Sequence, residues 1–384
     1  MKKIYTYMLM LLAAASVSCE KQSYEPSNDI ELIPEAGYIR FSTGVATKAP
    51  IIQNLRGKSF GVLGYYYGYS TRWDVARPLA KPEVFYNLEV ACDAGNGVCT
   101  YDSAPEDGIQ LKPWDLTKKY SFFAYYPMAD VNNGVSISAQ SAVNMPTVTY
   151  NLPLVGNANG AEVNPDDLID LMTAYAIDKT AGDGNVGFTF QHRLFCIEVL
   201  AQNFNTKNTR KDANGNPVKD ADGKDVMIDA DETISDLKLT IDNLAYKGVT
   251  VPMMKGDSEP VKVANDKGAV DFRLLSSTES VLVRSHDESS SAVSLSGTDG
   301  SNIVMLVPQT AAAAEGGKLE GSLTFNLTNS AGDSQTVTGE FSSDIDFQEG
   351  KKYTIMVSFT GDTIVIALAE SGSWEPYSVN YEFE

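Results

Sequence analysis

Apolar and polar positions alternate with a period of two along much of the chain, and helical periodicity hardly appears. Residues 353–359 carry tyrosine, isoleucine, valine and phenylalanine at every second position. Gly361-Asp362 then fits a two-residue hairpin turn, and residues 364–368 continue the apolar face on a return strand. The same alternation is found over residues 148–152, 237–241 and 323–327. These segments predict antiparallel strands.

Denser apolar runs predict strands that are covered on both faces. Residues 60–67 and 120–126 are rich in aromatic side chains, and residues 303–307 form a continuous apolar run that Pro308 ends. Residues 310–315 have the composition of a single helical turn. Strands at this spacing, without intervening helices, indicate an all-β chain of antiparallel β-sandwiches rather than a parallel α/β sheet.

The apolar residues change face within residues 188–199. Phe188 and Phe190 share one face, whereas Phe195, Ile197 and Val199 share the opposite one. Such a strand either bulges or passes from one packing partner to another. Because a glycine-rich stretch precedes it, we place a domain boundary near residue 185. The predicted organisation is a signal peptide (1–18), a tether (19–35), an N-terminal sandwich (36–184) and a C-terminal sandwich (185–384) with an exposed polar excursion at 208–225.

The charge balance narrows the classes of partner. The 384 residues include 30 basic and 50 acidic ones, for a net charge of −20. Such a field repels phosphate backbones, so we expect no nucleic acid partner and no electrostatic attraction to an anionic membrane surface.

Few residues offer catalytic or metal chemistry. There are only two histidines, His192 and His286, and the chain has no P-loop, no GxGxxG, no G-x-S-x-G and no paired CxxC. We interpret His192, which lies among phenylalanines, as a hydrogen-bonded core residue. The neighbouring carboxylates Asp166 and Asp167 fit a solvated turn better than a glycosidase pair. We therefore expect no enzyme activity, no metal and no cofactor.

Oxygen-bearing residues alternate within 212–216 and 220–222, as they do in calcium loops. The glycine falls at the wrong position for an EF-hand, and no glutamate follows at the twelfth position. A solvated hairpin explains these residues as well. Tyrosine and phenylalanine clusters at 65–69 and 120–126 could stack on sugars if exposed, but we favour a role in the sandwich core.

The N-terminus has the pattern of an export signal. Lys2 and Lys3 precede the mostly apolar residues 4–15, and small residues lead to Cys19. This resembles a bacterial lipobox, in which the cysteine is lipidated and becomes the first residue, although Ser16 replaces the usual leucine. The alternative is an ordinary signal peptide.

If the protein is exported to an oxidising compartment, its remaining cysteines can form disulfides. Cys92 and Cys99 flank a turn-rich loop and are a candidate disulfide, whereas Cys196 lies in an apolar run and is interpreted as a buried free thiol. At the other end of the chain, Val379, Tyr381 and Phe383 alternate with polar residues. This strand could pair within its own domain or be donated to another subunit's sheet.

Taken in order, several short motifs resemble the fimbrillin (Mfa-like) lipoproteins of anaerobic Gram-negative bacteria. The motifs are Cys19, residues 39–41, 46–49, 60–66, 120–127 and 170–172, the Phe-x-His strand through Phe190 and His192, residues 306–309 and 350–353, and Trp374. The resemblance covers nearly the full length.

The resemblance implies two tandem transthyretin-like β-sandwich domains and a structural or adhesive part in surface fimbriae, as shaft, tip or anchor. It implies a lipid anchor in the outer membrane, other fimbrial subunits as partners, and a surface receptor or glycan as a further partner. In the family, a trypsin-like protease removes the first strand, and a neighbouring subunit's strand refills the groove. Carried onto this chain, the excised strand would include residues 38–43, with Lys48 or Arg56 as the candidate cleavage residue. The alternative function is a surface glycan-binding lipoprotein.

Overall fold

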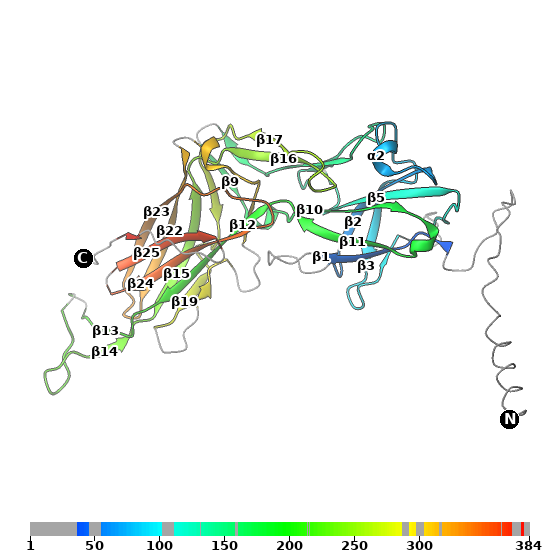
Figure 1. Cartoon of the computed structure of the whole chain (residues 1–384). Helices are drawn as coiled ribbons and strands as arrows, with labels where there is room; N and C mark the ends of the chain where they lie inside the picture. The colour runs from blue at the N-terminus through cyan, green and yellow to red at the C-terminus, as the bar shows by residue number, and fades with distance from the viewer. Residues whose placement is uncertain are drawn as a thin grey trace, which may run out of the picture. The chain divides into compact units, whose positions relative to one another are not determined.

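The computed structural model describes residues 37–45, 55–101, 111–130, 132–157, 160–212, 214, 216–285, 292–296, 303–314, 317–361, 363–370 and 378–379 (Figure 1). Nearly all of its regular structure is β-strand, which confirms the all-β class. The helices of these residues are single turns: α2 (Trp73–Ala76) and the 3-10 turns η2 (Pro165–Asp167), η3 (Ala181–Asp183) and η4 (Ala311–Ala313). The helical turn expected at 310–315 is thus η4, whereas α2 was not expected.

The first sheet is built mainly from the N-terminal part of the chain. In order, its seven strands are β1 (Phe41–Val45), β11 (Val186–His192), β10 (Met172–Lys179), β5 (Lys118–Tyr126), β2 (Ser59–Gly68), β3 (Phe85–Cys92) and β4 (Cys99–Thr100). Every one of these strands contributes to one buried apolar cluster. The sheet is curled, because its two end strands, β1 and β4, meet at the contact between Thr43 and Cys99.

Strands β2 and β5 are buried on both faces, as their dense apolar pattern predicted. Phe60 and Phe122 lie in the cluster inside the curled sheet, whereas Tyr65 and Phe123 face the other way. There their rings pack against Trp73 of α2, at centroid distances of 5.0 Å each. The aromatic clusters of these strands are therefore mainly core, as the sequence favoured.

Two further sheets contain most of the C-terminal strands. One has the order β23 (Ser334–Ser343), β22 (Leu319–Asn329), β15 (Glu232–Ile241), β18 (Val270–Arg273), β9 (Gly160–Val163) and β8 (Val155–Asn157), with β19 (Ser280–Val283) also on β15. The other has the order β20 (Val293–Ser294), β12 (Phe195–Asn203), β24 (Lys352–Thr360), β25 (Thr363–Glu370) and β26 (Ser378–Val379), with β21 (Val304–Leu306) also on β12. Their inward residues share one apolar cluster.

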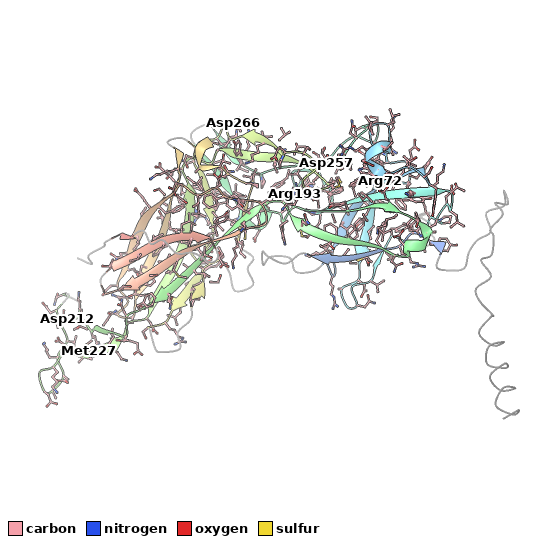
Figure 2. All side chains as sticks on the ribbon, viewed as in Figure 1. Arg72, Arg193, Asp212, Met227, Asp257 and Asp266 are labelled. Carbon is pink, nitrogen blue, oxygen red and sulfur yellow. A yellow bond between two sulfur atoms is a disulfide. The ribbon has the colours of Figure 1, made fainter. Side chains whose placement is uncertain are left out.

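The remaining pairings form two smaller sheets. One has the order β17 (Val261–Ala264), β16 (Tyr246–Pro252), β7 (Thr147–Asn151) and β6 (Val135–Ile137). The other is the hairpin of β13 (Lys207–Thr209) and β14 (Met227–Asp229), on which Figure 2 labels Asp212 and Met227. Residues of this hairpin are mostly exposed, as expected for the polar excursion.

The face change within 188–199 corresponds to two strands in different sheets. Strand β11 ends at His192, and β12 begins at Phe195. Of the two readings of this segment, the change of packing partner is therefore correct. The boundary near residue 185 stays a prediction, and pairing crosses it: β11 joins β10 and β1, while β7 pairs with β16.

Not every neighbouring pair is antiparallel. In the described part of the chain, β1 with β11, β12 with β24, and β9 with β18 are parallel. Parallel neighbours cannot be joined by a hairpin, so each pair brings together segments far apart in the sequence. Periodicity predicts a strand but does not predict such a distant partner.

Candidate functional site: the seat of the first strand

Strand β1 lies along the end of the first sheet, next to β11 (Figure 1). Their parallel register runs from Phe41 opposite Val186 to Val45 opposite Phe190. The ladder is extended by the N–H of Val186, which donates to the carbonyl oxygen of Arg40 at 2.8 Å. On this side, β1 is therefore held by backbone hydrogen bonds along its length.

The inner face of β1 fills the core of the curled sheet. Ile39, just before β1, is completely buried and Phe41 is 4% exposed, whereas Arg40 and Ser42, at the alternate positions, face solvent. The Phe41 ring lies amid four other rings, with centroid distances between 5.4 and 6.0 Å: Phe85, Tyr101, Phe122 and Phe188. Burying two such side chains contributes about 1.5–3 kcal/mol each.

On the side that faces away from β11, β1 and the residues just before it contact a wall formed by Tyr101 and Lys112. The hydroxyl of Tyr101 donates to the carbonyl oxygen of Ile39 at 2.8 Å, and the N–H of Ile39 donates to the carbonyl oxygen of Lys112 at 2.8 Å. The N–H of Lys112 in turn donates to the Tyr101 hydroxyl at 3.1 Å. We call the groove between this wall and β11 the strand seat; β1 is the strand that fills it.

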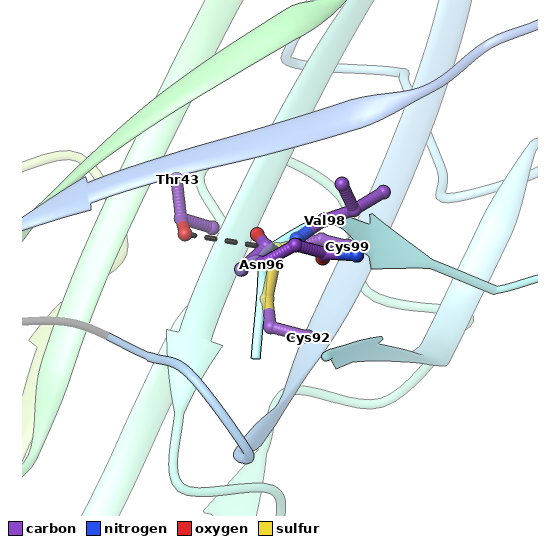
Figure 3. The surroundings of a disulfide bond; sticks show 6 residues. Thr43, Cys92, Asn96, Val98 and Cys99 are labelled. Carbon is purple, nitrogen blue, oxygen red and sulfur yellow. Dashed lines mark hydrogen bonds between the residues drawn. A yellow bond between two sulfur atoms is a disulfide. The ribbon is translucent and has the colours of Figure 1, made fainter. Parts of the chain in front are cut away.

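The candidate disulfide closes the hairpin of β3 and β4, beside the strand seat. Cys92 and Cys99 are bonded in the structure, and both are buried. In the turn between them, the Asp93 carboxylate accepts hydrogen bonds of 2.9 Å from the N–H groups of Asn96 and Gly95, which lower the pKa of Asp93. Figure 3 shows Thr43 of β1 facing this disulfide, with 3.7 Å between Thr43 Oγ1 and Cys99 Sγ.

The cleavage and lipidation candidates are only partly within the described residues. Cys19 and Lys48 lie outside them. Arg56 is in an exposed turn before β2, and its Nη1 donates to the carbonyl oxygen of Gly95 at 3.2 Å. The next residue, Gly57, has a φ of +68° and donates its N–H to the carbonyl oxygen of Cys92 at 2.8 Å. The Arg56–Gly57 peptide bond is thus fixed against the disulfide hairpin.

The C-terminal strand is described only at β26. Val379 is opposite Ile364 of β25, in an antiparallel pair. Tyr381 and Phe383 lie outside the described residues. The two residues of β26 follow the intradomain reading of the sequence, and donation to another subunit remains a proposal.

The catalytic and metal candidates are held in structural roles. The buried Asp170 carboxylate accepts a hydrogen bond of 2.8 Å from Nδ1 of buried His192. Asp166 and Asp167 lie in the turn η2, with the carboxyl side chains in the first turn and Asn164 as the cap. Burial raises the pKa of the Cys196 thiol to about 12, so this thiol stays protonated.

The aspartates of the two candidate calcium loops likewise accept hydrogen bonds from backbone N–H groups. The Asp212 carboxylate accepts from the N–H groups of Asn214 and Asn216, and Asp220 accepts from those of Asp222 and Lys224. Within the ranges described above, no group of three His, Cys, Asp or Glu residues is placed to hold a metal ion. In the same ranges, no helix has the length and apolar character needed to cross a bilayer.

Sequence reasoning found β1 and the disulfide but not the wall between them. Tyr101 and Lys112 contact β1 only because the sheet curls, and neither belongs to a segment of alternating apolar residues. The one available signal was the aromatic side chain of Tyr101, two positions after Cys99 in a polar stretch.

Comparison with known proteins places this fold. The structure of a fimbrial protein from Bacteroides vulgatus is similar over 88% of this chain and 99% of its own, with a TM-score of 0.51 and 18% sequence identity. A protein assigned to cell adhesion from Bacteroides ovatus matches over 90% and 99%, with a TM-score of 0.46 and 14% identity. The comparison with curated proteins found no match.

The sequence match is more direct. The model of the fimbrillin-like family matches residues 81–374, which is most of the chain and includes β3, β4 and β11 of the first sheet. The resemblance found in the short motifs is confirmed by this match. The chain belongs to the fimbrillin-like family.

Proposed function

We propose that this protein is a structural subunit or adhesin of surface fimbriae that joins its neighbours by strand addition. The observation that carries the proposal is the strand seat, in which the short strand β1 covers the aromatic core at the end of the first sheet. Membership of the fimbrillin-like family supports the fimbrial part. Under this proposal the protein has a structural rather than a catalytic role.

Export comes first in the proposed sequence of events. Lipidation of Cys19 would attach the chain to the outer membrane, with residues 19–35 as the tether. Cleavage after Lys48 or Arg56 would then separate β1 from the rest of the chain. After the cut, β1 is held only by the noncovalent contacts of the strand seat.

Loss of β1 leaves a site that a new strand can fill. The backbone of β11 loses its partner from Val186 to Phe190, and the pocket of Phe41 opens to solvent. Unpaired sheet edges and exposed apolar slots are both unfavourable in water, so an incoming strand with apolar residues at alternate positions gains free energy by docking. Strand addition of this kind needs no chemical catalysis.

The proposed donor is the C-terminal strand of a second subunit, with Val379, Tyr381 and Phe383 as the inward residues. The test is a serine triple variant at these positions, expressed in the cells that produce the protein, with alanine at Ser378, Asn380 and Glu382 as the matched control. We expect folded monomer without polymers for the first variant and normal fimbriae for the control. Normal fimbriae from both would eliminate this donor.

The mature N-terminus separates the possible roles. We expect chains in sheared fimbriae to begin just after the cleavage residue, and chains confined to membranes to begin at acylated Cys19. If every fraction contained only chains that begin at acylated Cys19, the protein would not be a cleaved, polymerising subunit. That result would favour an anchor or a glycan-binding lipoprotein.

One observation favours the glycan-binding alternative. Tyr66 and Tyr69 remain 41% and 55% exposed, and the Nζ atoms of Lys118 and Lys119 lie 5.4 and 6.0 Å from the centroids of their rings. Exposed rings of this kind can stack on sugar faces. The test is a glycan array. Glycans that bind the unaltered protein but neither Tyr66→Ala nor Tyr69→Ala would support the glycan-binding alternative, and an array without any bound glycan would count against it.

A further inference from the structure

The hairpin of β3 and β4, closed by the Cys92–Cys99 disulfide, has no part in the function proposed above. It lies against β1 on the side opposite β11, and its Cys99 sulfur lies 3.7 Å from the Thr43 hydroxyl oxygen (Figure 3). We propose that this hairpin is the second wall of the strand seat, and that it determines which strand of a second copy the seat holds and how firmly. The inference rests on the proposed strand addition for its partner, but its geometry concerns β1 alone.

The first step of the argument is the spacing of the inward residues. Ile39, Phe41 and Thr43 alternate along the strand, and the first two are buried. On the wall, Ile39 is hydrogen bonded to Tyr101, Phe41 packs on the same ring at 5.7 Å, and Thr43 meets Cys99. The segment from the disulfide to Tyr101 therefore contacts all three of these residues.

The second step is the shape that this wall gives to the seat. At the position of Phe41, four rings form a pocket for an aromatic side chain. At the position of Thr43, a sulfur lies 3.7 Å from the side-chain oxygen. Thr43 is half-buried, and a longer side chain there would crowd the hairpin, where overpacking costs about 1–3 kcal/mol. The seat thus fits an apolar, an aromatic and a small residue at successive inward positions from Ile39 to Thr43, so the proposed C-terminal donor would have to lie with Phe383 at the Ile39 end and Val379 at the Thr43 end.

The third step is why the disulfide matters for the wall. Strand β4 has only two ladder pairs with β3, Ala91 with Thr100 and Cys92 with Cys99. A pairing so short is marginal without another constraint. The β3 side is fixed independently, because the N–H of Cys92 donates to the carbonyl oxygen of Lys58 at 2.9 Å. Breaking the disulfide should therefore loosen the β4 wall while leaving β3 in place.

The experiment measures strand binding directly. The full mature chain would carry an engineered protease site within residues 46–54, and after cleavage its strand would be exchanged for a fluorescent peptide of residues 38–45. Peptides with Thr43→Arg and Ser42→Arg carry the same added charge and bulk on opposite faces of the strand. We expect Thr43→Arg to weaken binding by about tenfold or more, and Ser42→Arg to change it by less than about twofold. Equal binding of the two peptides would overturn the proposal.

A second measurement tests the covalent link. In the double variant Cys92→Ser with Cys99→Ser, we expect the unmodified peptide to be released about tenfold faster than from the unaltered chain. An unchanged release rate would show that the disulfide does not support the wall. If the double variant does not fold, the peptide comparison on the unaltered chain still decides the matter.

The two proposals fail in different ways. Discrimination between the Arg peptides, together with an absence of polymers from cleaved subunits, would support the wall and reject strand addition. Normal polymers together with equal binding of the two Arg peptides would support strand addition and reject the role of the wall.

Discussion

The hydroxyl of Tyr101 donates a 2.8 Å hydrogen bond to the carbonyl oxygen of Ile39, and it also accepts one from the N–H of Lys112 at 3.1 Å. One side chain therefore satisfies two backbone groups, one on the strand that fills the seat and one on the wall beside it. Because both groups lie beside a buried strand, losing the hydroxyl leaves them without this partner.

We expect Tyr101→Phe to lower the free energy of unfolding by about 1–3 kcal/mol, the cost of leaving buried polar groups unsatisfied. Urea denaturation measures the change. Tyr69→Phe is the matched control, because Tyr69 is 55% exposed, and it should leave the stability within about 0.5 kcal/mol. Equal stabilities of the two variants would contradict the role of Tyr101.

Phe41→Ala should be the most damaging substitution in β1. It removes a ring that packs on four others, and truncation of a buried phenylalanine costs about 3–5 kcal/mol. Ser42→Ala, one residue along on the exposed face, should cost less than about 0.5 kcal/mol. The same urea denaturation compares them, and a loss below about 1 kcal/mol for Phe41→Ala would show that the pocket collapses around the gap.

Cleavage by trypsin should occur after Lys48 rather than after Arg56. The Arg56 guanidinium donates to Gly95, and the N–H that follows the scissile carbon belongs to Gly57 and is bonded to Cys92. A protease needs an extended segment, so cutting there requires this turn to open first. In limited digestion, we expect Lys48→Gln to abolish the early product and Arg56→Gln to leave it unchanged, as read by N-terminal sequencing. An early product that begins at Gly57 would refute this order.

Glu232 should make the stability of the protein fall as the pH rises from about 4.5 to about 7. Burial, followed by the charge of Asp231, raises the pKa of Glu232 to about 7. Between the unfolded and folded pKa values, the folded state binds a proton that the unfolded state has released, so stability decreases with pH in that window. The contribution is fully present below about pH 4.5 and is lost as the pH passes the folded pKa.

The control for this effect is Glu232→Gln, which cannot titrate. The difference in unfolding free energy between the two proteins, measured by urea denaturation at several pH values, should change by a few kcal/mol, on the order of 1.4 kcal/mol per pKa unit. A difference that is independent of pH between 4.5 and 7 would mean that the carboxyl is solvated in the folded protein.

Much of the fold could be predicted from local patterns. Alternation identified the β24–β25 hairpin, and the glycine in its turn has the positive φ of +60° that the two-residue loop requires. The face change identified the passage from β11 to β12. In both cases the information lies within about a dozen neighbouring residues, and the pleat of a strand converts it directly into burial.

The seat could not be predicted in the same way. Its inward residues were visible as an early strand, yet their contacts with Phe188, Tyr101 and Cys99 depend on the curl of a seven-stranded sheet. The helix α2 was missed for a similar reason, since its four residues are defined by the packing of Trp73 and not by periodicity. Tertiary contacts of this kind override local propensity.

The parallel pairings delay part of the folding until late in synthesis. Strand β1 pairs with β11, and β12 pairs with β24, so each awaits a partner that the ribosome makes much later. Until then, Phe41 and Phe195 have no completed sheet to cover them, and contacts so distant in sequence form slowly. Until both partners have been made, these apolar side chains stay exposed in the incomplete chain, and incompletely folded species of this kind are prone to aggregate.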